Sequence, residues 1–280
     1  MATTSMQAPR HTASRSRALG TALLEDAYAA SPILPIDRRS RLVLFSDCHR
    51  GAGGSGDAFA PNKQLYLAAL DHYIQAGFTY VEVGDGDELW KGWHYDAIRS
   101  AHPQVFYRLS ELQSEGLLHR IIGNHELLPG REPQRMHDEF PLHPGLILDS
   151  TATGQRIFVV HGHQADPHNA SYNRFSHSVV RYLWSSVQRC GLVGVSAKPR
   201  SFAGKPSQPV ATRIARWASA RGLTVICGHT HQPAYAQPGG PAYFNTGSCI
   251  YPGYLTGIEI HGNDIIPVRW SYEAGRVEVV

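Results

Sequence analysis

Residues able to bind metal recur in this sequence directly after short apolar runs. Five such groups follow one another along the chain: SDCH, GDGDE, GNHE, HGH and GHTH. Their carboxylates, imidazoles and one amide form a mixed oxygen and nitrogen set that borderline divalent metals accept. A single histidine in such a position more often hydrogen-bonds a carbonyl. The ordered series, however, offers more donors than one tetrahedral ion can use, and it favours a larger metal site.

The acidic residues of this series suit a pair of metal ions. Two ions about 3.5–4 Å apart need a shared ligand, and the Asp85 carboxylate can bridge them. The ions would also share a hydroxide made from water at neutral pH, which suits the hydrolysis of a phosphate ester. Glycines permit a sharp exit from a strand and leave space beside the backbone, and four of them stand at positions 84, 123, 162 and 228.

The elements that must carry these residues follow from the hydrophobic pattern. The apolar runs RLVLFSD at 41–47 and TYVEVGD at 79–85 predict strands, with a helix between them. A second helix is predicted before LHRIIGNHE, and strands are predicted in LILDSTATGQRIFVVHGH and in the C-terminal part. In an open α/β sheet the loops after the strands gather at one edge, so we expect the metal-binding residues to converge.

We expect an N-terminal tail with a short helix over residues 1–40 and a catalytic domain over residues 41–280. Residues 164–221, approximately, interrupt the strand pattern with two stretches of helical spacing, which predicts a helical insertion. A chain of 280 residues with 42% hydrophobic content can bury the core of one large domain. Its apolar runs are shorter than the ~18 residues of a membrane span, so we expect no such span.

The net charge indicates which classes of partner to expect, and the cysteines indicate the cellular compartment. The net charge of +3 is too mild to predict nucleic-acid binding, although a pI near 8.7 suits anionic substrates. The four cysteines form no CxxC pair, which favours a reducing, cytoplasmic environment over a disulfide framework. The N-terminal stretch lacks the apolar segment of a signal peptide, and an organelle transit peptide is the alternative to a simple tail.

The five groups together resemble the motifs of the calcineurin-like metallophosphoesterases, from Leu42 to Cys249. The resemblance implies an α/β fold, namely a β-sandwich flanked by helices (α/β/β/α), with a helical cap formed by the insertion. It also implies two divalent ions, manganese first, with iron or zinc as alternatives. One ion would be held by Asp47, His49, Asp85 and His231. The other would be held by Asp85, Asn124, His161 and His229.

The same resemblance implies a reaction. The bridging hydroxide would attack phosphorus in line, and His125 would protonate or stabilise the leaving oxygen. The substrate would be a small phosphate ester or a nucleotide-linked pyrophosphate. Arg50 follows the first motif, and we expect it to bind phosphate bidentately. His163 is expected either to orient a ligand or to face the substrate.

Within the family, GDGDELW and the helical stretch after HGH look most like the UDP-2,3-diacylglucosamine pyrophosphatase branch, where the insertion caps the site. Glu88 stands where aspartate is commoner, and the glycine-rich stretch GAGGSGDAF departs from that pattern. Serine/threonine protein phosphatases share GNHE, but their second motif has an arginine that this one lacks. The alternatives are a nuclease, which would need a basic groove with stacking aromatics, and a metal-stabilised binding protein without turnover.

Overall fold

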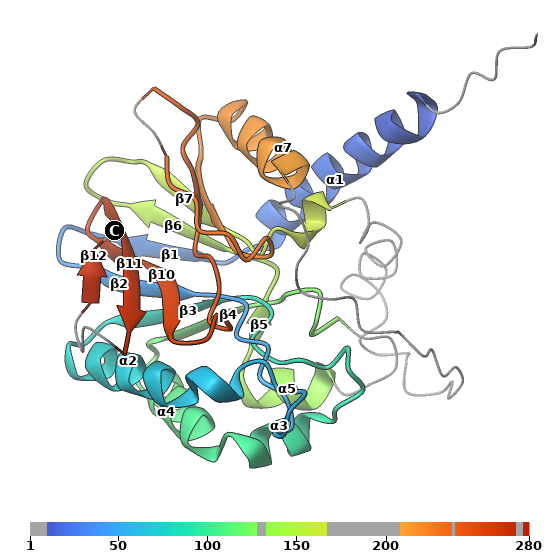
Figure 1. The fold of residues 1–280 in the computed structure, drawn as a ribbon. Helices are drawn as coiled ribbons and strands as arrows, with labels where there is room; N and C mark the ends of the chain where they lie inside the picture. Colours follow the sequence, from blue (N-terminus) through green and yellow to red (C-terminus); the bar gives the residue numbers. More distant parts are fainter. Residues whose placement is uncertain (1–9, 128–132, 167–207, 237–238, 273–276, 280) are drawn as a thin grey trace, which may run out of the picture.

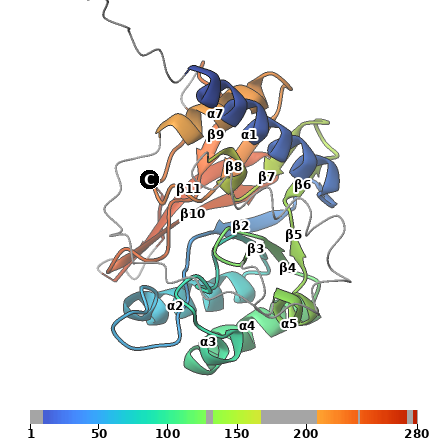
Figure 2. The same ribbon diagram turned by 90° about the vertical axis from the view of Figure 1, so that its right-hand side faces the viewer.

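Two β-sheets lie face to face, and helices cover the outer face of each (Figure 1, Figure 2). This confirms the predicted α/β/β/α arrangement. The computed structural model describes residues 10–127, 133–166, 208–236, 239–272 and 277–279. Within this part of the chain, no helix is long and apolar enough to cross a membrane.

The larger sheet has seven strands in the order β12-β11-β10-β2-β3-β4-β5. Strands β2 to β5 pair in parallel, and β10 to β12 extend the sheet in antiparallel fashion. The strands are β2 (Arg41–Phe45), β3 (Thr79–Val83), β4 (Leu118–Ile121), β5 (Leu142–His143), β10 (Tyr254–His261), β11 (Asp264–Ser271) and β12 (Val277–Val279). The two strands predicted at 41–47 and 79–85 are parallel neighbours, with Leu42 opposite Thr79.

The smaller sheet has five strands in the order β1-β6-β7-β8-β9. They are β1 (Ile33–Ile36), β6 (Leu146–Ser150), β7 (Arg156–Val159), β8 (Thr224–Cys227) and β9 (Tyr243–Asn245). Strand β1 lies in the segment where the sequence predicted only a tail and a short helix. It is an edge strand, and Pro35 suits an edge because its missing N–H leaves no hydrogen bond unmade within the sheet.

Helices cover the outer faces of both sheets (Figure 1). On the larger sheet they are α2 (Lys63–Gln75), α3 (Tyr95–Ala101), α4 (Pro103–Ser114) and α5 (Pro133–Glu139). Strand β2 shows how the layers pack, since Leu42 and Leu44 face the core between the sheets while Val43 and Phe45 pack toward the helices. A strand buried on both faces must be apolar at every position, which is why its sequence is a continuous apolar run.

The smaller sheet is covered by α1 (Arg10–Ala30) and α7 (Gln208–Ser219) (Figure 1). Helix α7 belongs to the segment predicted as a helical insertion. Its residues Ile214 and Trp217 share a buried cluster with Leu24 of α1 and Phe158 of β7, so this helix is packed on the body of the protein. Residues 167–207, the rest of the predicted insertion and cap, lie outside the described residues.

Candidate metal centre

Loops that follow adjacent strands carry the first predicted ligands. Asp47 and His49 come after β2, and Asp85 comes after β3. The two loops continue side by side: the N–H of Asp47 donates to Gly84 O (3.0 Å), and the N–H of His49 donates to Asp85 O (2.9 Å). Because β2 and β3 are parallel neighbours, their ends lie at the same edge of the sheet, and the three side chains are brought together.

The smaller sheet supplies the remaining histidines. His161 follows β7, and His229 and His231 follow β8, its parallel neighbour. Asn124 comes from the larger sheet, after β4. The two sets of loops meet directly, since His161 Nε2 lies 3.2 Å from Asp85 Oδ2. The structure therefore gathers predicted ligands from both sheets in one place.

Five predicted ligands have a left-handed backbone conformation. They are Asp47 (φ 52°), His49 (φ 48°), Asp85 (φ 52°), His229 (φ 68°) and His231 (φ 58°). Among the residues that the structure describes, these are the non-glycine residues with positive φ. Such a conformation costs on the order of 1–3 kcal/mol and persists where the surroundings impose it, which is typical of a functional site.

Among the described residues, three groups of side chains have ligand atoms within 4.8 Å of one another and could hold a metal ion; one of them is His49, Glu88 and His125. The other two consist of predicted ligands and are Asp47, His49 and His231, and Asp85, His161 and His229. In the first, His231 Nε2 lies 3.0 Å from Asp47 Oδ1. Asn124 is buried, and the N–H of the residue after it, His125, donates to Asp85 of the second group. The grouping parallels the two ligand sets that the sequence resemblance implies.

Asp47 and Asp85 each accept a backbone hydrogen bond from a neighbouring loop with one carboxylate oxygen, while the other oxygen faces histidines of the site. Asp47 Oδ2 accepts from the N–H of His229 (3.0 Å), and Asp85 Oδ1 accepts from the N–H of His125 (2.8 Å). Asp85 Oδ2 lies 3.2 Å from His161 Nε2 and 3.9 Å from His49 Nε2, one histidine from each group. One carboxylate oxygen of Asp85 therefore lies near both groups of predicted ligands.

The donor set fits divalent cations. Asn124 is buried, and its Oδ1 has no hydrogen-bond partner among the described residues. A buried acceptor normally has a partner, and a metal ion would satisfy this one. His161 donates from Nδ1 to Val83 O (2.8 Å), which leaves Nε2 toward the centre, as in a metal-binding histidine. Imidazole, carboxylate and amide donors together suit manganese, iron or zinc.

Three glycines lie in contact with the ligands. A Cβ at Gly123 would come within 2.1 Å of Asp85 Oδ1. A Cβ at Gly84 would come within 2.5 Å of the His161 ring, and one at Gly228 within 2.6 Å of Asp47 Oδ2. These distances are too short for any side chain, so glycine is needed for the loops to approach one another here.

Comparison with known proteins identifies the family. Residues 40–233, more than half of the chain, match the family model of the calcineurin-like phosphoesterases. The chain belongs to this family. The matched segment contains all of the predicted metal ligands. A search of curated proteins found no sequence that matches this chain.

Two solved structures of Vps29 are similar to this chain at low sequence identity. Vacuolar protein sorting 29 from Cryptosporidium parvum is 10% identical with a TM-score of 0.39, and the match covers 86% of this chain and 95% of that chain. Wild-type Vps29 from Entamoeba histolytica, complexed with zinc, is 15% identical with a TM-score of 0.39. That match covers 86% of this chain and 97% of the Vps29 chain. These are distant likenesses, and the family assignment rests on the sequence match.

His125 is held between two acidic side chains. Its Nδ1 donates to Glu88 Oε1 (2.8 Å), and its Nε2 lies 3.9 Å from Asp85 Oδ2. Burial opposes the charged ring, but Asp85 and Glu88 outweigh it and raise the pKa of His125 to about 9. The ring therefore carries a proton on Nε2 at neutral pH. Glu88 also lies 3.3 Å from His49 Nδ1, so it orients two imidazoles.

Arg50 does not take the role that the sequence predicted. Its guanidinium is fully buried and donates to Asp87 Oδ1 (2.8 Å) and to both oxygens of Glu82 (2.6 and 3.0 Å). Arg120 donates to the same two carboxylates. Because the side chain is enclosed and all three of its nitrogens are engaged, the expected phosphate clamp is wrong. Arg50 instead ties together β3, β4 and the loops after β2 and β3.

His163 is buried beside two ligands. Its ring centroid lies 5.4 Å from that of His161 and 6.4 Å from that of His229. Burial and the neighbouring His161 hold the pKa of His163 well below its usual range, so the ring is neutral. Within the described part of the chain, this packing favours a ligand-orienting role over a substrate contact.

Two acidic residues of the site were not predicted from the sequence. Glu126 is buried, and one of its oxygens accepts from the N–H groups of Asp85 (3.0 Å) and Gly123 (2.7 Å), which joins the loops after β3 and β4. Asp166 Oδ2 lies 3.0 Å from His229 Nε2. Their signals in the sequence are the glutamate that ends GNHE and the aspartate that follows HGH by three residues.

Metal binding is expected to release a proton and to strengthen as pH rises. Burial opposes protonation of His161, but Asp85 outweighs it and raises the pKa of His161 to about 10. The metal-free ring is thus protonated at pH 7.5 and must lose that proton to bind an ion. Because its folded-state pKa is raised, protonation stabilises the metal-free protein fully below about pH 6.5, and this stability is lost as pH rises toward 10.

Calorimetry of Mn²⁺ binding at pH 7.5, in buffers of different ionisation enthalpy, measures this release. We expect the release of about one proton when an ion binds to Asp85, His161 and His229. In the His161→Asn variant, the number of protons released on metal binding should fall by about one. A binding enthalpy that is the same in every buffer would contradict the expectation.

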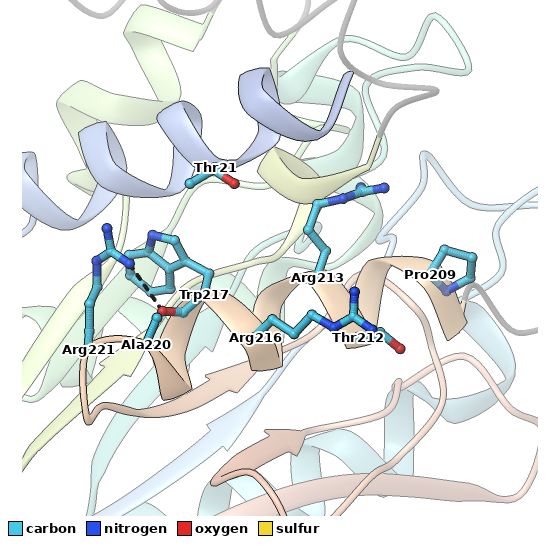
Figure 3. A pocket seen from close by; sticks show the side chains of 8 residues that line it. All are labelled: Thr21, Pro209, Thr212, Arg213, Arg216, Trp217, Ala220 and Arg221. Atoms are coloured by element: carbon cyan, nitrogen blue, oxygen red, sulfur yellow. Dashed lines mark hydrogen bonds between the residues drawn. The ribbon is translucent and has the colours of Figure 1, made fainter. Parts of the chain in front are cut away.

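A cavity of about 590 Å³ lies between α1 and α7 (Figure 3). Trp217, Arg213 and Arg216 of α7 line it together with Thr21 of α1. Arg221 also lines it, and its guanidinium donates to Trp217 O (3.2 Å). None of the predicted metal ligands lines this cavity, so it is separate from the metal centre.

Proposed function

We propose that this phosphoesterase uses two divalent ions to hydrolyse a small phosphate ester or a nucleotide-linked pyrophosphate. The observation that carries the proposal is the position of Asp85 Oδ2 between His161 of one ligand group and His49 of the other. A carboxylate so placed suits a ligand shared by two ions. The likeness of GDGDELW to the UDP-2,3-diacylglucosamine pyrophosphatases makes a nucleotide-linked pyrophosphate one substrate to test.

In this proposal, one set of residues binds the metal ions and another residue donates a proton. One ion would be held by Asp47, His49, Asp85 and His231, and the other by Asp85, Asn124, His161 and His229. When bound, the ions supply a water-derived nucleophile at neutral pH and neutralise charge on the phosphate. His125 holds a proton at Nε2 for the leaving oxygen, and Glu88 fixes the ring through Nδ1. Manganese is the proposed metal, with iron or zinc as alternatives.

Elemental analysis combined with turnover assays tests the proposal. We expect about two metal ions per chain. We also expect Mn²⁺-dependent hydrolysis of at least one of three probes: p-nitrophenyl phosphate, bis-p-nitrophenyl phosphate and a UDP-linked pyrophosphate. The probe that is hydrolysed identifies the ester class. Bound metal without hydrolysis of any probe would favour a binding protein, and a chain that binds no metal would refute the proposal.

Replacing His125 by asparagine is expected to lower kcat while metal content is unchanged. General acid catalysis contributes about 10²- to 10⁴-fold, and the loss should fall in that range for a substrate with a poor leaving group. Asn124, the neighbouring ligand, remains in place, so elemental analysis of the variant should match that of the unaltered protein. Loss of metal together with activity would instead make His125 part of the metal-binding set.

A further inference from the structure

Trp90 packs flat against His125. The ring centroids lie 4.4 Å apart, and the planes meet at 17°. Trp90 belongs to the loop after β3 that also carries Asp85 and Glu88, and it is only partly buried. Filling the core is therefore not its main contribution. Trp93 of the same loop packs elsewhere, against Gly51, where a Cβ would come within 2.3 Å of the Trp93 ring.

Three neighbours together fix the imidazole of His125. The hydrogen bond from Nδ1 to Glu88 Oε1 (2.8 Å) directs the opposite nitrogen, Nε2, toward the metal centre. A single hydrogen bond leaves the ring able to turn about its own axis, because the terminal torsion of histidine is broad. Trp90 covers one face of the ring, and His49 meets the ring at 4.5 Å with planes at 81°. These two contacts set the ring plane.

We propose that Trp90 is a positioning residue, whose indole face holds the His125 ring in the plane that aims Nε2 at the leaving oxygen. The inference rests on the proposed function, since it assumes that His125 donates a proton. Trp90 acts through His125, so its effect is confined to the step that needs this proton. Esters with poor leaving groups need the proton more than esters with good ones.

A pair of substrates with different leaving groups separates this role from a general structural one. The full chain, loaded with Mn²⁺, is assayed on phenyl and p-nitrophenyl esters of the class that it hydrolyses. Trp90→Leu is expected to lose about tenfold more kcat on the phenyl ester than on the p-nitrophenyl ester, with KM little changed. Trp90→Phe, which keeps an aromatic face, should recover most of that loss. Trp93→Leu is the matched control and should change kcat by the same factor on both esters.

A structure of the metal-free Trp90→Leu variant gives a readout that does not depend on turnover. We expect the His125 ring to leave its plane or to occupy two orientations, while the Trp93→Leu variant keeps it in place. Equal losses on both esters, or an unmoved His125 ring, would refute the positioning role alone. Failure of the unaltered protein to hydrolyse p-nitrophenyl phosphate, bis-p-nitrophenyl phosphate and the UDP-linked pyrophosphate alike would refute the proposed function and the positioning role with it.

Discussion

Replacing Asp85 by asparagine is expected to lower kcat/KM by about a thousandfold or more and to reduce the metal content below two ions per chain. Metal ions stabilise transition-state charge by several kcal/mol, and each 1.36 kcal/mol corresponds to about a tenfold change in rate. Asp85 Oδ2 lies between His161 (3.2 Å) and His49 (3.9 Å), so both ligand groups depend on it. Despite burial, the surrounding histidines hold the pKa of Asp85 well below its usual range, and it is ionised at neutral pH.

The substitution is chosen to preserve the fold around the lost charge. An asparagine oxygen can still accept from the N–H of His125, as Asp85 Oδ1 does (2.8 Å). Asp71→Asn is a suitable control, because Asp71 is a partly exposed carboxylate of α2 that pairs with Arg108 of α4 and belongs to none of the predicted ligand loops. It should leave metal content and kcat/KM unchanged. Wild-type metal content with wild-type turnover in the Asp85→Asn variant would exclude Asp85 as the shared ligand.

The convergence of the predicted metal ligands could be foreseen because each one follows a buried strand. Apolar runs fix the strands, and parallel pairing then brings their ends to one edge. Asp85 and His161 are therefore in contact although one follows β3 and the other follows β7 of the opposite sheet. The order of the motifs along the chain is therefore enough to predict that these residues converge, although it gives no distances between them.

The role of Arg50 could not be predicted in the same way. Its position beside His49 indicated a phosphate contact, but its partners Glu82 and Asp87 come from elsewhere in the chain. A signal was present, because Glu82 interrupts the apolar strand TYVEV and a glutamate is almost never fully buried unless it is paired. The sequence shows that Glu82 needs a cation, but only the fold shows which one.

The contact between Trp90 and His125 could not be predicted from the sequence. Stacking of two rings depends on the path of the loop and on side-chain torsions, neither of which leaves a periodic pattern in the sequence. Strand β1 was missed for a related reason. ILPI is only four residues long and contains a proline, and its pairing with β6 depends on a segment more than a hundred residues later.

Replacing Arg50 by alanine is expected to lower the free energy of unfolding by about 3–5 kcal/mol, because it leaves a buried charge uncompensated. In the unaltered protein two arginines, Arg50 and Arg120, balance two carboxylates, and all four side chains are buried. Despite burial, the arginines hold the pKa of Glu82 below its usual value and that of Asp87 at about 2. Both acids are thus ionised at neutral pH in the unaltered protein. Urea denaturation of the metal-free protein measures the change.

Two further variants separate this structural role from a phosphate clamp. Arg108→Ala removes the partly exposed pair with Asp71 and should cost less than about 1 kcal/mol. Arg50→Met combined with Glu82→Gln leaves one cation and one carboxylate, so the charges balance again. This double variant should be more stable than the sum of the two single changes predicts, since the residues form one network. A phosphate clamp would behave differently: KM would rise in Arg50→Ala while the free energy of unfolding stayed the same, because the guanidinium would then bind substrate and not Glu82 and Asp87.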